Sequence, residues 1–195
     1  ENIGIGFMFA PMHHSAMKHA IGPRKELGVR TLFNVLGPLT NPASAPNQVI
    51  GVFDRKWLNP LAETLKQLGS KHIIVVHSED GMDEISISNK TYIAELKDNE
   101  IKNYEITPDY FNIDRYSIDE LSVSNINESL SMMKSVFNNH NNAAKAVVAL
   151  NAGAAIYASG ISKSMKEGVL KAFSLIESGE AKNKFEMLIK HSQSF

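Results

Sequence analysis

The segment 49–77, VIGVFDRKWLNPLAETLKQLGSKHIIVVH, decides the fold of this chain. It opens with the apolar run Val49–Phe53, continues with leucines at helical spacing from Leu58 to Leu68, and closes with the apolar run His72–His77. A short, continuous apolar run is typical of a strand that is covered on both faces. Strand, helix and strand in this order form a βαβ unit, so the segment predicts parallel strands in an α/β fold.

Shorter strands and then helices are predicted after this unit. Alternating apolar residues predict three strands, which we expect to form an antiparallel edge, at Glu84–Ser88, Thr91–Leu96 and Ile101–Ile106. Apolar residues at helical spacing predict four helices, at Asn125–Asn138, Ala143–Ser159, Met165–Ser178 and Glu180–His191. The sequence therefore predicts an α/β fold in which helices flank a mostly parallel sheet.

The amino-terminal part has a different pattern. Ile5–Phe9 is predicted to be a short strand and His13–Ile21 a helix, and Val29–Pro42 is dense in Gly, Pro and Asn, which gives a loop a defined shape. We expect residues 1–28 to form an opening strand with a residual helical hinge segment, and residues 29–195 to form an incomplete α/β domain. The chain starts with Glu1, so we expect a fragment or a processed chain; an initiator Met lost with an expression tag explains the same start.

Composition narrows the classes of function. The 195 residues are 43% hydrophobic, enough to bury a core, and 20 basic residues balance 21 acidic ones, for a net charge of -1. Such a balance provides no long-range field for a nucleic-acid backbone or an anionic membrane. The absence of cysteine excludes disulfides and thiol nucleophiles and fits a reducing location, so we expect a cytoplasmic protein. From the balanced charge we expect neither nucleic-acid nor membrane partners.

Three carboxylates directly follow the buried strand, in the segment Asp80-Gly81-Met82-Asp83-Glu84. Ligands in open α/β sheets gather beyond the carboxyl ends of the strands. Clustered carboxylates suit a hard cation such as Mg²⁺, which in turn suits a phosphate or pyrophosphate substrate. A solvated acidic turn has the same composition, and on this segment alone that interpretation is favoured.

Other candidates lie before residue 43. The planar guanidinium of Arg24 can hold a carboxylate through two parallel hydrogen bonds, although a surface cation on a short helix is the alternative. The pair His13-His14 can bind a metal or carry protons, but neighbours on a helix face different directions, so one lines a cleft or has a structural role. The stretch Asn34–Pro42 has no phosphate-loop spacing and is either a rigid connector or the wall of a binding cleft.

Four segments carry a family resemblance: HHSAMKHAIGPRKELGVRTLFNVLGPLTNP at 13–42, VVHSEDGMDEIS at 75–86, ALNAGAAIYASG at 149–160 and, less specifically, KEGVLKAFSLIESGEA at 166–181. Their order and spacing resemble the anthranilate phosphoribosyltransferase family along nearly the whole chain. The resemblance implies transfer of the 5-phosphoribosyl group from phosphoribosyl pyrophosphate (PRPP) to the amine of anthranilate, with Mg²⁺, in tryptophan biosynthesis. It also implies a small helical domain beside a larger α/β domain, an active site at the hinge between them, and a homodimer.

The resemblance assigns roles to five residues. Arg24 matches the arginine that contacts the anthranilate carboxylate, and Asp83 and Glu84 match the acidic pair that holds Mg²⁺. His14 and Pro38 match positions near the tunnel through which anthranilate enters. No catalytic nucleophile or base is assigned, because the aromatic amine is already nucleophilic and the harder step is departure of pyrophosphate, which positioning and charge neutralisation accelerate.

The sequence also departs from the family pattern. The GTGGD, Asn-x-Ser-Thr and KHGNR segments, which carry most PRPP contacts in the family, are not found, so we expect the small helical domain to be largely missing and the isolated chain to be inactive. Ser78 and Asn112 stand where glycine is more usual, and we expect tolerated loop changes. Two alternatives are an enzyme resembling pyrimidine nucleoside phosphorylase and a non-catalytic nucleic-acid-binding relative, which would need a basic groove.

Overall fold

The structure is a computed structural model that describes residues 3–7, 37–41, 43–140 and 142–194. The larger of two compact units is Ala45–Asn183, and the described residues before and after it belong to the other. Of the predicted strand Ile5–Phe9, residues 5–7 are described and are not in a strand. The predicted helix at His13–Ile21 and the domain boundary at residue 28 lie outside the described residues and stay predictions.

The larger unit contains the predicted βαβ arrangement. Its elements are β1 (Asn47–Gly51), the short 3-10 helix η2 (Arg55–Trp57), α4 (Leu58–Gln67) and β2 (His72–Ser78). β1 and β2 pair in parallel, and β2 is buried along almost its whole length. Of the leucines that predicted the helix, α4 buries those at positions 58, 61 and 65, whereas Leu68 follows the helix and is exposed.

The sheet continues with β3 (Thr91–Lys97) and β4 (Glu100–Ile106), in the order β1-β2-β3-β4. β3 is antiparallel to both of its neighbours, so the predicted antiparallel edge is confirmed for these two strands. Asp98 and Asn99 connect them with φ angles of 51° and 63°, a left-handed conformation that Asp and Asn tolerate in tight hairpins. The α/β class is confirmed, and among the described strands the parallel pairing is confined to β1 and β2.

The predicted strand at Glu84–Ser88 is wrong, because this segment is an irregular loop. Ile85 and Ile87 are buried in the core, which produces the alternating pattern. Their backbone, however, bonds to side chains: the N–H of Ile85 donates to Asn151 Oδ1 at 2.9 Å, and the N–H of Ser86 donates to Thr91 Oγ1 at 3.0 Å. Burial and strand pairing are separate properties, and only the first is visible in the pattern.

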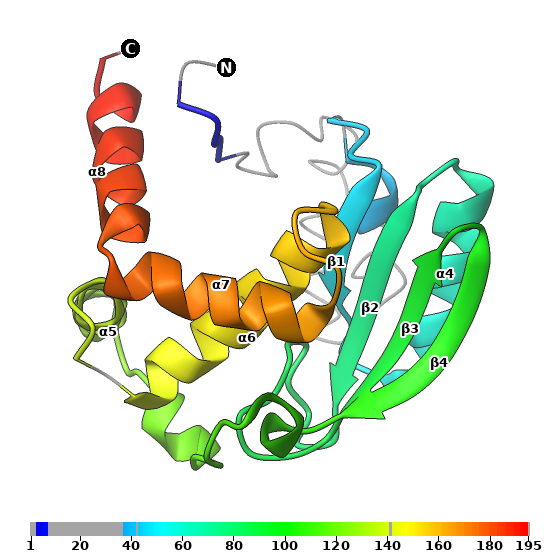
Figure 1. The fold of residues 1–195 in the computed structure, drawn as a ribbon, viewed down its shortest axis with the longest axis horizontal. Coiled ribbons are helices and arrows are strands. Elements are labelled where there is room, and N and C mark those ends of the chain that lie inside the picture. The colour runs from blue at the N-terminus through cyan, green and yellow to red at the C-terminus, as the bar shows by residue number, and fades with distance from the viewer. Residues whose placement is uncertain (1–2, 8–36, 42, 141, 195) are drawn as a thin grey trace, which may run out of the picture. The chain divides into compact units, whose positions relative to one another are not determined.

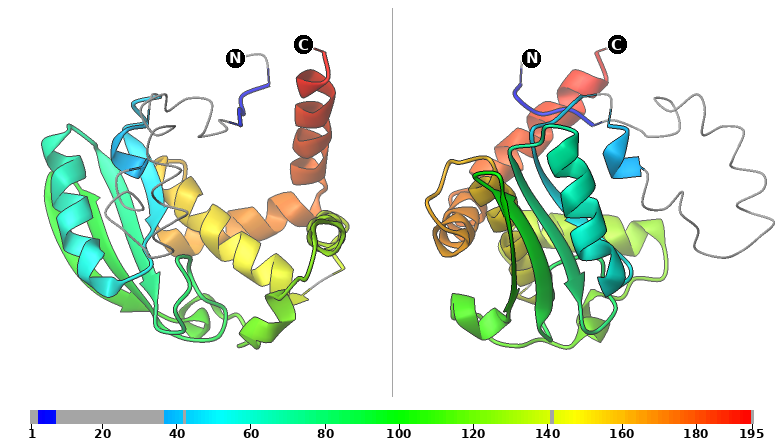
Figure 2. Two further views of the ribbon diagram at one scale, coloured as in Figure 1. Left: turned by 180° about the vertical axis from the view of Figure 1, so that it is seen from behind. Right: turned by 90° about the vertical axis from the view of Figure 1, so that its right-hand side faces the viewer.

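Helices cover both faces of the sheet (Figures 1 and 2). α4 packs against β2 and β3 on one face, whereas α6 (Asn142–Ala158) packs against β1 and β2 on the other, with α7 (Met165–Glu177) beside α6. A Cβ on Gly153 would lie 2.5 Å from the Cα of Val169, so this glycine allows α6 and α7 to approach closely. The glycine of the NAGAA segment therefore serves the packing of α6 against α7.

The α-helices α5 (Ile126–Phe137) and α8 (Glu180–Ser192) confirm the periodic pattern. The short 3-10 helices η3 (Pro108–Phe111) and η4 (Ile118–Leu121) were not predicted. Asn125 caps α5 and Ser164 caps α7, each by accepting a backbone N–H from the first turn. In the part of the chain that the structure describes, no helix combines the length and apolar character that crossing a membrane requires.

Candidate functional site

The acidic segment Asp80–Glu84 lies at the edge of the sheet where β1 and β2 both end, as predicted. Gly81 has a φ of 89°, which a residue with a side chain rarely adopts, and this turns the chain back on itself. The N–H of Gly81 donates to the Ser78 carbonyl at 2.9 Å, and the N–H of Ser78 donates to the Met82 carbonyl at 3.0 Å. A closed turn therefore presents the acidic residues at the carboxyl edge of the parallel strands, where α/β proteins bind ligands.

The carboxylate of Asp80 is hydrogen-bonded to other residues of the same loop. Its Oδ2 accepts hydrogen bonds from the hydroxyls of Ser86 and, at 2.6 Å, Ser88, and its Oδ1 accepts from the N–H of Met82 at 3.3 Å. Burial alone would raise the pKa of Asp80, but these hydrogen bonds outweigh it and the pKa lies below its ordinary value. The cluster of three carboxylates in the sequence thus reduces to a pair, Asp83 and Glu84.

The acidic pair, Asp83 and Glu84, faces solvent. Surrounding protein atoms raise the pKa of the Glu84 carboxyl, and the negative charge of Asp83 raises it further. Mg²⁺ in proteins is commonly bound by one or two carboxylates together with waters and substrate phosphates. The pair fits that mode of binding, and within the described ranges no group of three or more His, Cys, Asp or Glu side chains forms an all-protein cage.

Three elements hold the backbone that carries the acidic pair. At the end of β1, a Cβ on Gly51 would lie 1.5 Å from the carbonyl oxygen of Asp83, so only glycine fits there. At the end of β2, the hydroxyl of Ser78 donates to the carbonyl of Glu84. On α6, the side-chain amide of Asn151 bonds to both backbone groups of Ile85.

Sequence reasoning missed Ser78 and Asn151 as parts of this site. Ser78, predicted to be a tolerated loop change, is instead the fully buried last residue of β2, and its hydroxyl is bonded. Asn112 fits the loop interpretation, since its φ of 58° is a conformation that glycine and asparagine adopt most readily. For Asn151 the available signal was an amide side chain in the middle of a mostly apolar helix, where an unpaired amide is unfavourable.

The structure does not test the roles predicted for Pro38, Arg24 and His14. Pro38 lies half-buried in a helical turn at 37–39, in the smaller unit. Arg24 and His14 lie outside the described residues. Their predicted roles toward anthranilate stay predictions.

A cavity of about 530 Å³ adjoins the acidic loop between α5 and α6. Met82 and Glu84 form one part of its wall. The remaining wall is mainly apolar and consists of Leu121, Ser129, Met132, Met133, Val136, Phe137, Ala144, Val147 and Val148. Glu84 thus borders both solvent and an apolar hollow, which agrees with the raised pKa of its carboxyl.

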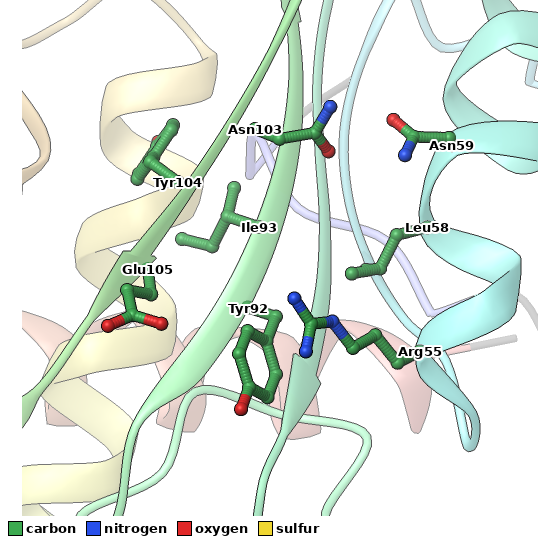
Figure 3. A pocket seen from close by; sticks show the side chains of 8 residues that line it. All are labelled: Arg55, Leu58, Asn59, Tyr92, Ile93, Asn103, Tyr104 and Glu105. Atoms are coloured by element: carbon green, nitrogen blue, oxygen red, sulfur yellow. The ribbon is translucent and has the colours of Figure 1, made fainter.

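A second hollow, of about 380 Å³, lies on the opposite face of the sheet, between α4 and β4. Figure 3 shows the Asn59 and Asn103 side chains pointing toward each other across it. The guanidinium of Arg55 lies 3.7 Å from the centre of the Tyr92 ring, a cation–π contact, and Glu105 brings the opposite charge. This hollow carries no net charge from its lining and is separated from α6 by the sheet.

These observations define a class of protein, namely an α/β domain with an acidic turn beyond its parallel strands. The chain matches the family described as "Glycosyl transferase family, a/b domain" over residues 1–182, and it belongs to that family. It is 52% identical, over 195 residues, to the anthranilate phosphoribosyltransferase of Methylococcus capsulatus; the match covers all of this chain and 57% of that protein. The resemblance predicted from the four sequence segments is therefore confirmed.

Solved structures show the same likeness. Anthranilate phosphoribosyltransferase (TrpD) from Thermus thermophilus has a TM-score of 0.89 and 39% identity, over 97% of this chain and 56% of that one. The Saccharomyces cerevisiae enzyme in complex with PRPP and Mg has a TM-score of 0.84 and 26% identity, over 93% and 53%. In complex with 4-fluoroanthranilate the yeast enzyme has a TM-score of 0.88 and 26% identity, over 97% and 55%. The chain spans a little over half the length of these relatives.

Proposed function

We propose that this chain is part of an anthranilate phosphoribosyltransferase and carries the acidic side of its active site. The observation that supports this most directly is the Asp83-Glu84 pair at the carboxyl edge of β1 and β2, in a chain 52% identical to a relative of that name. In the proposed reaction, the amine nitrogen of anthranilate forms a bond to C1 of the ribose, the bond from that carbon to pyrophosphate breaks, and the amine gives up a proton. The product would be an intermediate of tryptophan biosynthesis.

Asp83 and Glu84 would hold Mg²⁺, which when bound neutralises negative charge on the departing pyrophosphate. The task of this chain is to keep the two carboxylates ionised and in place. Because the pKa of Glu84 is raised, protons compete with Mg²⁺ for this carboxylate more strongly as the pH falls. The yeast relative's complex with PRPP and Mg supports the metal assignment.

Arg24 would hold the carboxylate of anthranilate, with His14 and Pro38 near the path by which anthranilate enters. The support for these roles is the sequence match at 13–42 together with the yeast relative's complex with 4-fluoroanthranilate. A guanidinium suits this task, because its paired N–H groups match the two oxygens of a carboxylate. We further propose that the complete protein is a cytoplasmic homodimer.

The test is the reaction of the complete gene product, followed by the loss of anthranilate fluorescence. We expect consumption of anthranilate that requires both PRPP and Mg²⁺. The double variant Asp83→Ala/Glu84→Ala should lower kcat/KM for PRPP by about 100-fold or more, since charge stabilisation of this kind is worth several kcal/mol. Turnover with unchanged Mg²⁺ dependence in the double variant would exclude the metal assignment, and phosphorolysis of a pyrimidine nucleoside in place of the anthranilate reaction would favour the phosphorylase alternative.

A further inference from the structure

We propose that Asn151 is a positioning residue of the metal-binding loop, and that its side-chain amide fixes the backbone from which Glu84 projects. The inference rests on the proposed Mg²⁺ role of Asp83 and Glu84. It goes beyond that role because it assigns a task to a helical residue that contacts no proposed substrate.

The amide of Asn151 pairs with both backbone groups of the residue after Glu84. Its Oδ1 accepts from the N–H of Ile85 at 2.9 Å, and its Nδ2 donates to the carbonyl of Ile85 at 3.2 Å and to that of Val147 at 2.9 Å. Ile85 is 1% exposed, so water cannot easily replace these partners. Asn151 therefore acts toward the loop as the backbone of a neighbouring strand would.

One peptide group is held at both ends by this arrangement. The carbonyl of Glu84 and the N–H of Ile85 belong to the same planar peptide group. The hydroxyl of the buried Ser78 donates to that carbonyl and lies 3.0 Å from Thr91 Oγ1, while Asn151 accepts from the N–H. The preceding peptide group, which contains the Asp83 carbonyl, lies against Gly51. Both peptide groups flanking Glu84 are thus fixed by residues of β1, β2 and α6.

This fixation bears directly on the side chains of Asp83 and Glu84. Within the described residues, no hydrogen bond or ion pair holds the side chain of Asp83 or Glu84. The backbone therefore sets where these two side chains begin and in which direction they project. Mg²⁺ demands near-ideal ligand geometry at short distances, and a loose loop would have to be ordered each time the ion binds. Removing the amide should weaken metal binding without removing a ligand.

The experiment compares Asn151→Ala and Ser78→Ala with Val169→Ala, a variant of a buried α7 residue that loses core packing and removes no hydrogen bond to the loop. Mn²⁺ is the probe, titrated into the purified protein, with paramagnetic broadening of backbone amide signals as the readout. Changes to residues that orient metal ligands typically cost about 10-fold to 100-fold in affinity, and we expect about 10-fold weaker Mn²⁺ binding for Asn151→Ala. We expect a smaller loss for Ser78→Ala, and for Val169→Ala unchanged affinity despite lower stability.

Amide hydrogen exchange of Ile85 gives a second readout that does not depend on the metal. It should accelerate strongly in Asn151→Ala and remain slow in Val169→Ala, because only the first variant releases that N–H. In the complete gene product, Asn151→Ala should raise the Mg²⁺ concentration for half-maximal rate and leave the KM for anthranilate unchanged.

Failure of this inference differs from failure of the proposed metal site. If Asp83→Ala/Glu84→Ala weakens Mn²⁺ binding but Asn151→Ala does not, the amide serves only the fold and the positioning role is wrong. If the double variant binds Mn²⁺ as tightly as the unmodified protein, the metal assignment itself is wrong and the inference fails with it.

Discussion

Hydrogen bonds from Ser86 and Ser88 outweigh burial and lower the pKa of Asp80, whereas burial and the neighbouring charge of Asp83 raise the pKa of Glu84. Both residues occur in one acidic segment, so residue type alone does not separate them. The difference arises from the hydroxyls that reach Asp80 and do not reach Glu84. Two neighbouring carboxylates such as Asp83 and Glu84 repel each other, and a bound cation relieves that repulsion. Variants of single residues can test this.

Glu84→Gln should change the pH dependence of stability when the metal is removed with a chelator. The folded pKa of Glu84 is raised, so its contribution is favourable at pH values below the unfolded pKa and is lost as the pH rises through the folded pKa. At pH 7 the glutamine variant should therefore be more stable, by no more than about 0.5 kcal/mol because the carboxyl is exposed and screened. Urea unfolding at neutral and acidic pH measures this, and a gain that persists below the unfolded pKa would contradict the assigned cause.

Arg24→Ala in the complete gene product should raise the KM for anthranilate and leave the KM for PRPP nearly unchanged. Hydrogen bonds to a charged group contribute about 1.5–3 kcal/mol, which corresponds to a rise of about 10-fold to 100-fold. Lys25→Ala is the matched control, because it removes a neighbouring positive charge without the planar donor pair. Equal effects of both variants on the KM for anthranilate would show that only local charge matters.

At the scale of elements, β1, β2 and α6 meet around the acidic loop. β1 contributes a glycine, β2 a hydroxyl and α6 an amide, and each contacts the backbone of residues 83–85. The sheet therefore does more than present its carboxyl edge to a ligand. Together with α6, it determines the path of the loop that carries the acidic pair.

Gly51→Ala should displace this loop. The added Cβ would lie 1.5 Å from the Asp83 carbonyl oxygen, which belongs to the backbone and cannot move aside alone. Overpacking of this kind typically costs about 1–3 kcal/mol of unfolding free energy, and we expect weaker Mn²⁺ binding as well. Gly6→Ala is the control, since a Cβ there meets nothing within 4 Å. Chemical unfolding and Mn²⁺ titration measure both effects, and a tolerated Gly51→Ala with unchanged Mn²⁺ affinity would contradict the described contact.

At the scale of the whole molecule, charge and family membership favour an enzyme over a nucleic-acid-binding relative. The chain carries 20 basic and 21 acidic residues, and its match to the glycosyl transferase family covers residues 1–182. It spans 57% of the Methylococcus capsulatus relative, so assays of turnover are best made on the complete gene product.

The purified protein should show no appreciable binding to duplex DNA at physiological salt. Nonspecific binding by basic proteins has dissociation constants of about 10⁻⁴–10⁻⁶ M and weakens steeply with salt. With a net charge of -1, we expect binding weaker than this range, measured by fluorescence anisotropy at several salt concentrations. Tight binding with a steep salt dependence would restore the nucleic-acid-binding alternative.

The sequence by itself determined the βαβ unit, the four later helices, the hairpin of β3 and β4, and the place of the acidic segment after β2. These features follow from periodicity and turn chemistry over a few neighbouring residues, which a single sequence displays directly. Tertiary structure alone decided that 84–88 is a loop and that Asn151 holds it. It also decided that Asp80 is hydrogen-bonded within the loop, while no described residue bonds to the side chain of Asp83 or Glu84. The physical reason is distance along the chain: the bond between Ile85 and Asn151 joins residues 66 positions apart, and no local pattern specifies which distant side chain a buried backbone group will meet.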